Sequence, residues 1–175
     1  MEGIRLLSET IIQELISCKK RAVKADRKRM VLLNRSYRND VSLISLDNKY
    51  TFKMFMRYSN DFNEDFSVGL IWTNSDKFFD VSKPIILIRY QGPHDSGQPL
   101  NGDIHNDYHI HEITSEDINE GRFLKPSSKE TTNKYASFGE AVQSFEADCS
   151  VIGLRECIDI SQIYKNIPGQ VKLPI

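Results

Sequence analysis

A chain of 175 residues with 39% hydrophobic and 27% charged side chains is long enough to bury a core, and its composition is that of an ordinary globular domain. Its formal net charge of −1 gives the whole molecule no bias towards polyanions, and no apolar run approaches the roughly 18 residues of a membrane span. The first residues lack a signal-peptide pattern, and three cysteines without a Cys-x-x-Cys pair are typical of reduced thiols. We therefore expect a cytoplasmic protein that makes no membrane contact.

The first segment, 1–29, is predicted to be a basic amphipathic helix. Apolar residues recur at steps of three and four from Leu7 to Ala22, which is the period of a helix. The stretch 19–29 then holds seven positive charges and one negative charge. A solvated helix end accounts for this, because the helix dipole favours cations there; contact with nucleic acid or an acidic partner is the alternative. The candidate nucleic-acid-binding residues are Lys19, Lys20, Arg21, Lys24, Arg27, Lys28 and Arg29.

The segment 30–113 is predicted to form the sheet. Short runs with alternating or continuous apolar residues, separated by polar turns, are typical of strands. These runs are 30–33, 41–46, 51–58, 66–73, 85–90 and 108–113. The run 85–90 is apolar on both faces as far as Leu87, which favours a central strand. The short links indicate a mostly antiparallel meander.

The remainder, 114–175, is predicted to hold helices and a tail. Thr114 and Asp117 have the spacing of a helix start, with Gly121 as its stop. Ser137 and Glu140 form a second capping-box pattern, which opens a helix near 137–149. The sequence therefore predicts a single α+β domain. Its mostly antiparallel sheet of five or six strands has an N-terminal helix and a C-terminal helix packed on it.

All four histidines lie in one window, from His94 to His111. The 17 residues 91–107, between two predicted strands, are rich in Gly, Pro, Asp and Asn, and a loop of that length is usually functional or disordered. His94 and His105 fall in this loop, and His109 and His111 fall on the strand that leaves it. Imidazole is the side chain best suited to proton transfer near neutral pH and the commonest metal ligand. The window is the candidate site, although a satisfied surface pair and a disordered insertion are the structural alternatives.

Strand alternation places His109 and His111 on one face, where two imidazoles can converge on a metal or a phosphoryl oxygen. The candidate catalytic residues are His109, His111, His94 and Arg89, the last as a clamp for an anion. The candidate metal ligands are His109, His111 and His105, which indicates a divalent metal as a cofactor, although the sequence leaves the cofactor open.

Two family patterns match only in part. A cupin requires a further histidine after His111, and a histidine-triad hydrolase requires a shorter interval between His105 and His109. A looser pattern, Arg89-Tyr-Gln-Gly-Pro-His94, then a variable insert and His109-Ile-His111, resembles uncharacterised small bacterial proteins that are often encoded on mobile or phage-linked DNA. That resemblance covers 50–150 and implies the place of a site but no activity.

Three function hypotheses follow. The first is a hydrolase or nuclease that acts on a phosphodiester or a nucleotide, linked to mobile-element or defence biology. The second is a non-catalytic interaction protein such as an antitoxin, an immunity factor or an anti-defence factor. The third is a metal-binding module built from histidine and aspartate. The partner is accordingly a protein or a nucleic acid, and the sequence leaves both open.

Overall fold

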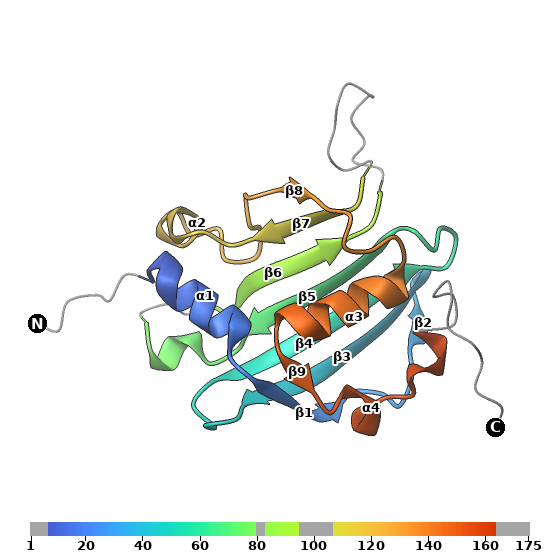
Figure 1. Cartoon of the computed structure of the whole chain (residues 1–175), viewed down its shortest axis with the longest axis horizontal. Helices are drawn as coiled ribbons and strands as arrows, with labels where there is room; N and C mark the ends of the chain where they lie inside the picture. The colour runs from blue at the N-terminus through green and yellow to red at the C-terminus, as the bar shows by residue number, and fades with distance from the viewer. Residues whose placement is uncertain (1–6, 80–82, 95–106, 164–175) are drawn as a thin grey trace, which may run out of the picture.

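A mixed sheet of nine strands forms the body of the computed structural model, which describes residues 7–79, 83–94 and 107–163 (Figure 1). The strands are β1 Lys20–Ala25, β2 Val31–Leu33, β3 Ser36–Ser45, β4 Thr51–Ser59, β5 Phe66–Trp72, β6 Ile85–Gln91, β7 His109–Glu112, β8 Glu130–Thr131 and β9 Val151–Ile152. Their order is β8-β7-β6-β5-β4-β3-β1-β9, and β2 pairs with β3 outside this path. The pairings are antiparallel except that of β1 with β9, which is parallel.

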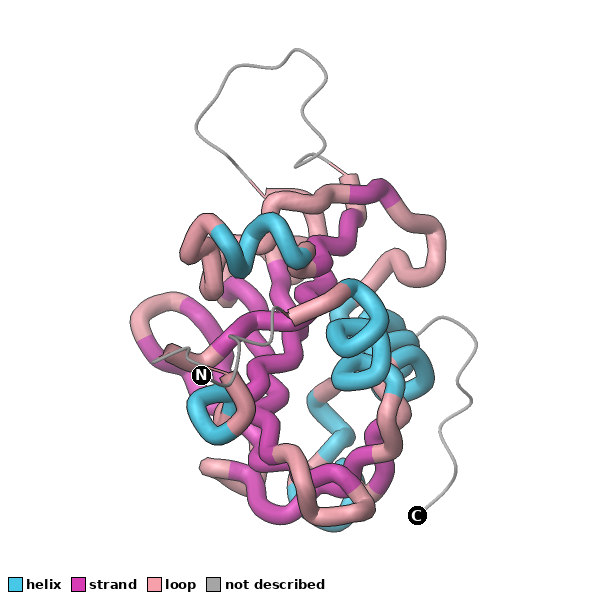
Figure 2. The backbone as a smooth tube through the Cα atoms, turned by 90° about the vertical axis from the view of Figure 1, so that its left-hand side faces the viewer, coloured by secondary structure: helices cyan, strands magenta, loops and turns pink. Residues whose placement is uncertain are grey.

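The helices are α1 Glu9–Ser17, α2 Ser115–Asn119, α3 Phe138–Asp148 and α4 Leu154–Cys157, with 3₁₀ turns at Ser75–Lys77 and Ile160–Gln162. Figure 2 shows the sheet bending around α1 and α3, so that both helices lie on its concave side. None of the described helices is long and apolar enough to cross a bilayer.

The core lies between the concave face of the sheet and these two helices. α1 contributes Ile12, Leu15 and Ile16, and α3 contributes a stripe that includes Val142 and Phe145. Residues directly opposite each other in antiparallel strands share a face. One such row crosses the sheet as Val41, Met54, Leu70 and Ile88, all of which are nearly or completely buried.

The prediction of a mostly antiparallel sheet of five or six strands is wrong, because the described residues form a mixed sheet of nine strands in which β1 and β9 are parallel. All six predicted strand segments correspond to strands, β2 to β7. The strands that sequence reasoning missed are β1, β8 and β9. β8 and β9 have two residues each, and a strand of two residues carries no alternation that a sequence pattern can detect.

The prediction of a helix over 1–29 is also wrong. α1 ends at Ser17, and Cys18 turns to an extended conformation with ψ of 143°. β1 begins two residues later, inside the expected helix. Alternate residues of β1, Lys20 and Ala22, face the concave side, but a lysine and an alanine do not form an apolar alternation that would distinguish a strand from a helix.

Lys20 explains why the chain changes direction here. Its ammonium group is completely buried and donates hydrogen bonds to the carbonyl oxygens of Ile16 and Cys18, both at 2.7 Å, and of Cys149, at 3.1 Å. Lys20 therefore binds the carboxyl ends of α1 and α3 together, where the dipoles of both helices favour a cation.

The two predicted capping sites are confirmed. Thr114 caps α2 in a capping box with Asp117, and Gly121 follows the helix with φ of +74°. Ser137 accepts a hydrogen bond from the backbone N–H of Glu140 at the start of α3.

Candidate histidine–arginine site

The candidate site lies on the face of the sheet opposite α1 and α3, which we call the outer face. Two rows of directly paired residues cross it. The first row consists of Arg38, Arg57, Ser67, Gln91 and His109, and the second of Asp40, Phe55, Gly69, Arg89 and His111. As predicted, the alternation of β7 places His109 and His111 on the same face, and Arg89 is directly opposite His111.

Three of the four histidines lie together. The ring centroids of His94 and His109 are 5.2 Å apart, and those of His109 and His111 are 5.0 Å apart. His94 thus returns over the end of β7 although it leaves β6 in a loop. His105 lies outside the described residues.

Backbone carbonyl groups fix the protonation of two of these rings. The Nδ1 atom of His94 is 3.0 Å from the carbonyl oxygen of Gly92, and the Nδ1 atom of His109 is 2.7 Å from that of Asp107. Because a carbonyl oxygen only accepts, each Nδ1 carries the proton, and the neutral ring has its lone pair on Nε2. Nε2 is therefore the nitrogen that can act as a base or a ligand atom in the neutral form of each ring, and of the two rings only that of His94 is partly exposed.

The end of β6 is shaped by Gly92 and Tyr135. The backbone N–H of Gly92 donates to the carbonyl of Phe66, and a side chain at this position would overlap the carbonyl oxygen of Glu64. The Tyr135 hydroxyl is 2.7 Å from the carbonyl oxygen of His109 and accepts from the backbone N–H of Gln91 at 3.1 Å. The Tyr135 contacts hold the end of β6, from which His94 follows, beside His109 at the start of β7.

Arg89 is half-buried and carries its charge without a carboxylate partner among the described residues. Its Nε atom is buried and makes no hydrogen bond within the described part of the chain. Burial, and then the nearby charge of Arg57, lower the pKa of Arg89, but a guanidinium group stays protonated at neutral pH. A cation held in this way favours the binding of an anion.

The members of the site differ in access to solvent. His109 and His111 are 0% and 2% exposed, whereas His94 and Arg89 are half-buried. His94 and Arg89 are therefore the side chains of this site that a bound molecule can contact. The buried ring of His109 packs against the ring of His94.

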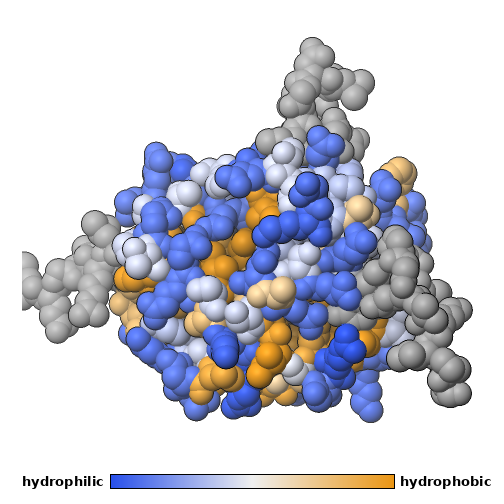
Figure 3. Space-filling view, viewed as in Figure 1, coloured by the Kyte–Doolittle hydropathy of each residue, from blue (hydrophilic) through white to orange (hydrophobic). Residues whose placement is uncertain are grey.

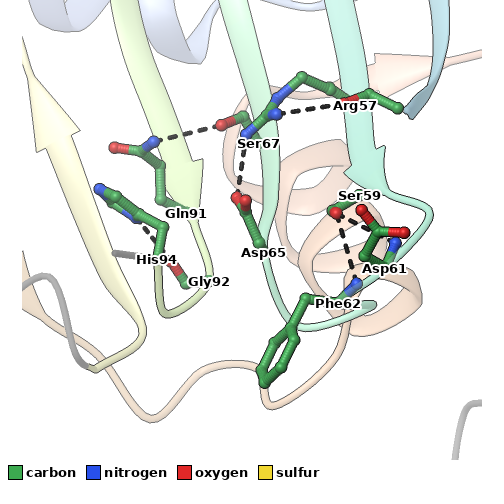
Figure 4. Close-up of polar contacts among 10 residues, drawn as sticks. Arg57, Ser59, Asp61, Phe62, Asp65, Ser67, Gln91, Gly92 and His94 are labelled. Carbon is green, nitrogen blue, oxygen red and sulfur yellow. Dashed lines mark hydrogen bonds and ion pairs between the residues drawn. The ribbon is translucent and has the colours of Figure 1, made fainter. Parts of the chain in front are cut away.

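Sequence reasoning missed the polar residues beside the histidines. Gln91 is 8% exposed and its Nε2 donates to the Ser67 hydroxyl at 3.2 Å, while Arg57 binds Asp65 at 2.9 Å (Figure 4). Figure 4 shows His94 beside Gln91, and Ser67 and Arg57 on the next two strands. The alternation of β4 and β5 is the signal that could have placed Arg57 and Ser67 on this face.

The predicted nucleic-acid-binding residues of 19–29 differ in their exposure to solvent. Lys20 is buried and binds carbonyl groups, so it is not available to a ligand. The other six candidates in 19–29 are exposed: Lys19, Arg21, Lys24, Arg27, Lys28 and Arg29. Lys24 pairs with Ser42, and Ser42 with Lys53, which places both lysines on the outer face.

Within the described residues, no group of three or more His, Cys, Asp or Glu side chains has an arrangement that holds a metal. The thiol of Cys149 is buried, and those of Cys18 and Cys157 are half-buried and free. A metal centre with His105 as a ligand involves a residue outside the described part of the chain.

A separate groove of about 880 Å³ lies on the concave side between α1 and α3. Its floor includes Ile88, Tyr90 and Ile110, and its rim includes Glu112 and Glu130. Figure 3 shows hydrophobic surface between the hydrophilic rims of this side. The groove and the histidines are on opposite faces of the sheet, so they form separate sites.

Comparison of the chain with protein-family models, with curated proteins and with solved structures finds no match. The functional conclusion therefore depends on the geometry of the chain itself.

Proposed function

We propose that the protein is a phosphodiester-directed hydrolase or nuclease whose site is formed by His94, His109, His111 and Arg89. The observation that carries this proposal is the series of three imidazoles, 5.2 and 5.0 Å apart, beside a half-buried guanidinium group without a carboxylate partner among the described residues. Imidazole transfers protons near neutral pH, and arginine binds phosphate in a forked pair of bonds. The link with mobile-element or defence biology rests on the sequence resemblance alone.

In the proposed reaction, His94 acts as the base and Arg89 stabilises the developing negative charge. A water molecule or a ribose hydroxyl attacks phosphorus, and the Nε2 atom of His94 takes the proton of that nucleophile. The bond from phosphorus to the leaving oxygen then breaks, and the leaving oxygen takes a proton from solvent or from the imidazolium. Arg89 stabilises the negative charge that grows on the phosphoryl oxygens. His109 contacts His94 and is a positioning residue.

The test is cleavage by the full chain of bis(4-nitrophenyl) phosphate and of end-labelled RNA and DNA, with and without EDTA. We expect His94→Gln to lose at least 100-fold in kcat/KM, since general acid–base catalysis contributes about 10²- to 10⁴-fold. Arg89→Gln should lose a similar factor because one charge-stabilising donor contributes about 10²- to 10³-fold. Arg35→Gln is the matched control, because Arg35 is exposed and binds Asp61 away from the histidines.

A positioning role for His109 needs its own readout. His109→Asn retains an N–H near the Nδ1 position that faces the Asp107 carbonyl, so it tests the ring rather than that hydrogen bond. We expect the acidic limb of the pH–rate profile to move, because that limb reports the protonation of the base, His94, which the His109 ring contacts. Absence of cleavage by the parent protein, or full activity of both His94→Gln and Arg89→Gln, overturns the proposed function.

The groove favours a second candidate function, the non-catalytic interaction protein. The carboxylates of Glu9, Glu112 and Glu130 surround an apolar floor, while Lys134 pairs with Asp148 at 2.9 Å. The excess of carboxylates is complementary to a basic, apolar segment of a partner protein. A model peptide of alternating lysine and leucine should bind the parent protein and bind Glu130→Lys at least fivefold more weakly. Equal binding to both proteins excludes this candidate.

A further inference from the structure

Three guanidinium groups lie on the outer face, from Arg38 on β3, Arg57 on β4 and Arg89 on β6. Arg38 is directly opposite Arg57 on the neighbouring strand, and like charges in this position destabilise a sheet. Arg57 in turn is close enough to lower the pKa of Arg89, after the larger effect of burial. Asp65 neutralises Arg57, but Arg38 and Arg89 form no ion pair with a described residue. An extended anion relieves this repulsion.

An aromatic ring lies among these cations. Phe55 is half-buried on the outer face, and its ring covers Gly69, where a side chain would overlap it. Gly69 is directly paired with Arg89, so the ring and the guanidinium group occupy adjacent positions of the second row. Aromatic side chains between cationic ones are the usual platform for unpaired bases.

A buried acceptor also faces this surface. The Oε1 atom of Gln91 has no hydrogen-bond partner within the described residues, although the side chain is only 8% exposed. The amide lies beside His94 and continues the row of Ser67 and Arg57 (Figure 4). A hydroxyl or an N–H group of a ligand at His94 satisfies this atom.

The cations extend well beyond a single phosphate. From β6 to β1 the outer face carries Arg89, Arg57, Lys53, Arg38 and Lys24, against one carboxylate in the same rows, Asp40. Four strand spacings at about 4.8 Å each give a width of about 19 Å. A mononucleotide covers only part of this surface, whereas several nucleotides of a single strand cover it.

We propose that the ligand of the outer face is a single-stranded polynucleotide. One phosphate lies at Arg89 and His94, a base stacks on Phe55, and neighbouring phosphates lie at Arg57 and Arg38. This inference rests on the proposed function only for the phosphate at His94, because the other contacts require binding and no cleavage.

The test measures the fluorescence anisotropy of labelled oligonucleotides as the full chain carrying His94→Gln is added. The substitution removes the proposed base, so the oligonucleotide probe stays intact. The probes are 20-nucleotide single strands of oligo-U and oligo-dT, a trinucleotide of each, and a 20-base-pair duplex, in 50 and 200 mM salt. We expect a 20-nucleotide strand to bind at least tenfold more tightly than its trinucleotide and more tightly than the duplex. Tight binding of either the RNA or the DNA strand supports the inference.

Three further variants locate the contact. Arg38→Glu should weaken binding at least fivefold and make the dependence of the affinity on salt less steep, since each phosphate contact releases counterions. Phe55→Ala should weaken binding at least fivefold, because base stacking on an aromatic ring is a strong contribution. Lys134→Glu makes the same change of net charge in the groove of the concave side and should change the affinity less than twofold. Arg38→Gln, checked by Trp72 fluorescence, replaces Arg38→Glu if the latter does not fold.

The two proposals fail in different ways. Equal affinity for the trinucleotide and the 20-nucleotide strand, or equal effects of Arg38→Glu and Lys134→Glu, overturns the inference even if small diesters are cleaved. Tight, length-dependent binding by a protein that cleaves nothing supports the inference and overturns the proposed function alone.

Discussion

Two buried charged side chains bind backbone groups of neighbouring segments: the Asp117 carboxylate accepts from N–H groups, and the Lys20 ammonium group donates to carbonyl groups. The Asp117 carboxylate accepts hydrogen bonds from the backbone N–H groups of Thr114 and Ser127, both at 3.1 Å, and from Arg122 at 2.8 Å. Burial by itself raises the pKa of Asp117, but the hydrogen bonds outweigh it and lower the pKa to about 2.

Asp117 therefore contributes stability that depends on pH. Its folded pKa lies below the ordinary value of 3.8, so the contribution is complete above that value and is lost as the pH falls towards 2. We expect Asp117→Asn to lower the free energy of unfolding by about 2 kcal/mol at pH 7, and by less below pH 4. Urea unfolding at several pH values measures this, with the exposed Asp26→Asn as the control. A loss that does not change with pH contradicts the assignment.

Lys20 has a charge without a carboxylate partner among the described residues, and desolvation lowers its pKa. Lys20→Met retains the length of the side chain and removes three donors, which leaves three carbonyl groups without them. We expect the free energy of unfolding to fall by roughly 1–3 kcal/mol, the cost of unsatisfied buried polar groups. Lys24→Met in the same strand is the control, since Lys24 is exposed. Equal or higher stability of Lys20→Met shows that the buried charge costs more than its hydrogen bonds return.

At the scale of the element, two glycines test how closely the chain packs around them: Gly69 in β5 and Gly92 directly after β6. A methyl group at Gly92 overlaps a backbone carbonyl, which cannot turn away, whereas one at Gly69 overlaps the end of the Phe55 ring, which can. We expect Gly92→Ala to lower the melting temperature and to displace His94, at a cost of about 1–3 kcal/mol. Gly69→Ala should leave stability within about 1 kcal/mol. The prediction fails if the two substitutions have equal effects.

The same scale shows how far a sequence predicts this fold. The strands β4 to β7 alternate or are continuously apolar over four or more residues, and the caps of α2 and α3 use local hydrogen bonds, so both are readable from the chain. A sequence pattern does not predict β1, because a lysine is normally a surface residue. The burial of Lys20 is explained only by the carbonyl groups that it binds at the ends of α1 and α3. β8 and β9 form only because distant strands offer them an edge.

The site was readable in part. The alternation of His109 and His111, and the position of Arg89 beside them, follow from two strands of known period. The contact of His94 with His109 depends on the turn at Gly92, and the burial of His109 depends on tertiary packing. Neither this contact nor the burial of His109 can be predicted from the spacing of the histidines in the sequence. The alignment of Arg38 with Arg57 requires the register of β3 and β4, which a sequence pattern does not give.

For the whole molecule, one core joins the first and the last of the described residues. The buried cluster extends from Leu7, before α1, to Ile163, after α4, and α1 and α3 pack on the same sheet. We expect the single tryptophan, Trp72, which is buried in β5, to lose its native fluorescence at the same urea concentration at which the far-UV circular dichroism is lost. Two separate transitions contradict a single cooperative unit.

The parallel strand β9 and the ammonium group of Lys20 have a consequence for biosynthesis. Lys20 and its acceptor Cys149 are 129 positions apart, and the edge of β1 that faces away from β3 pairs with Val151–Ile152 of β9. Until residues 149–152 have been made, the amino-terminal part of the nascent chain therefore has an unpaired strand edge at β1, and Lys20 lacks one of its three carbonyl acceptors. Chaperones that shield such edges should bind the emerging chain until α3 and β9 leave the exit tunnel.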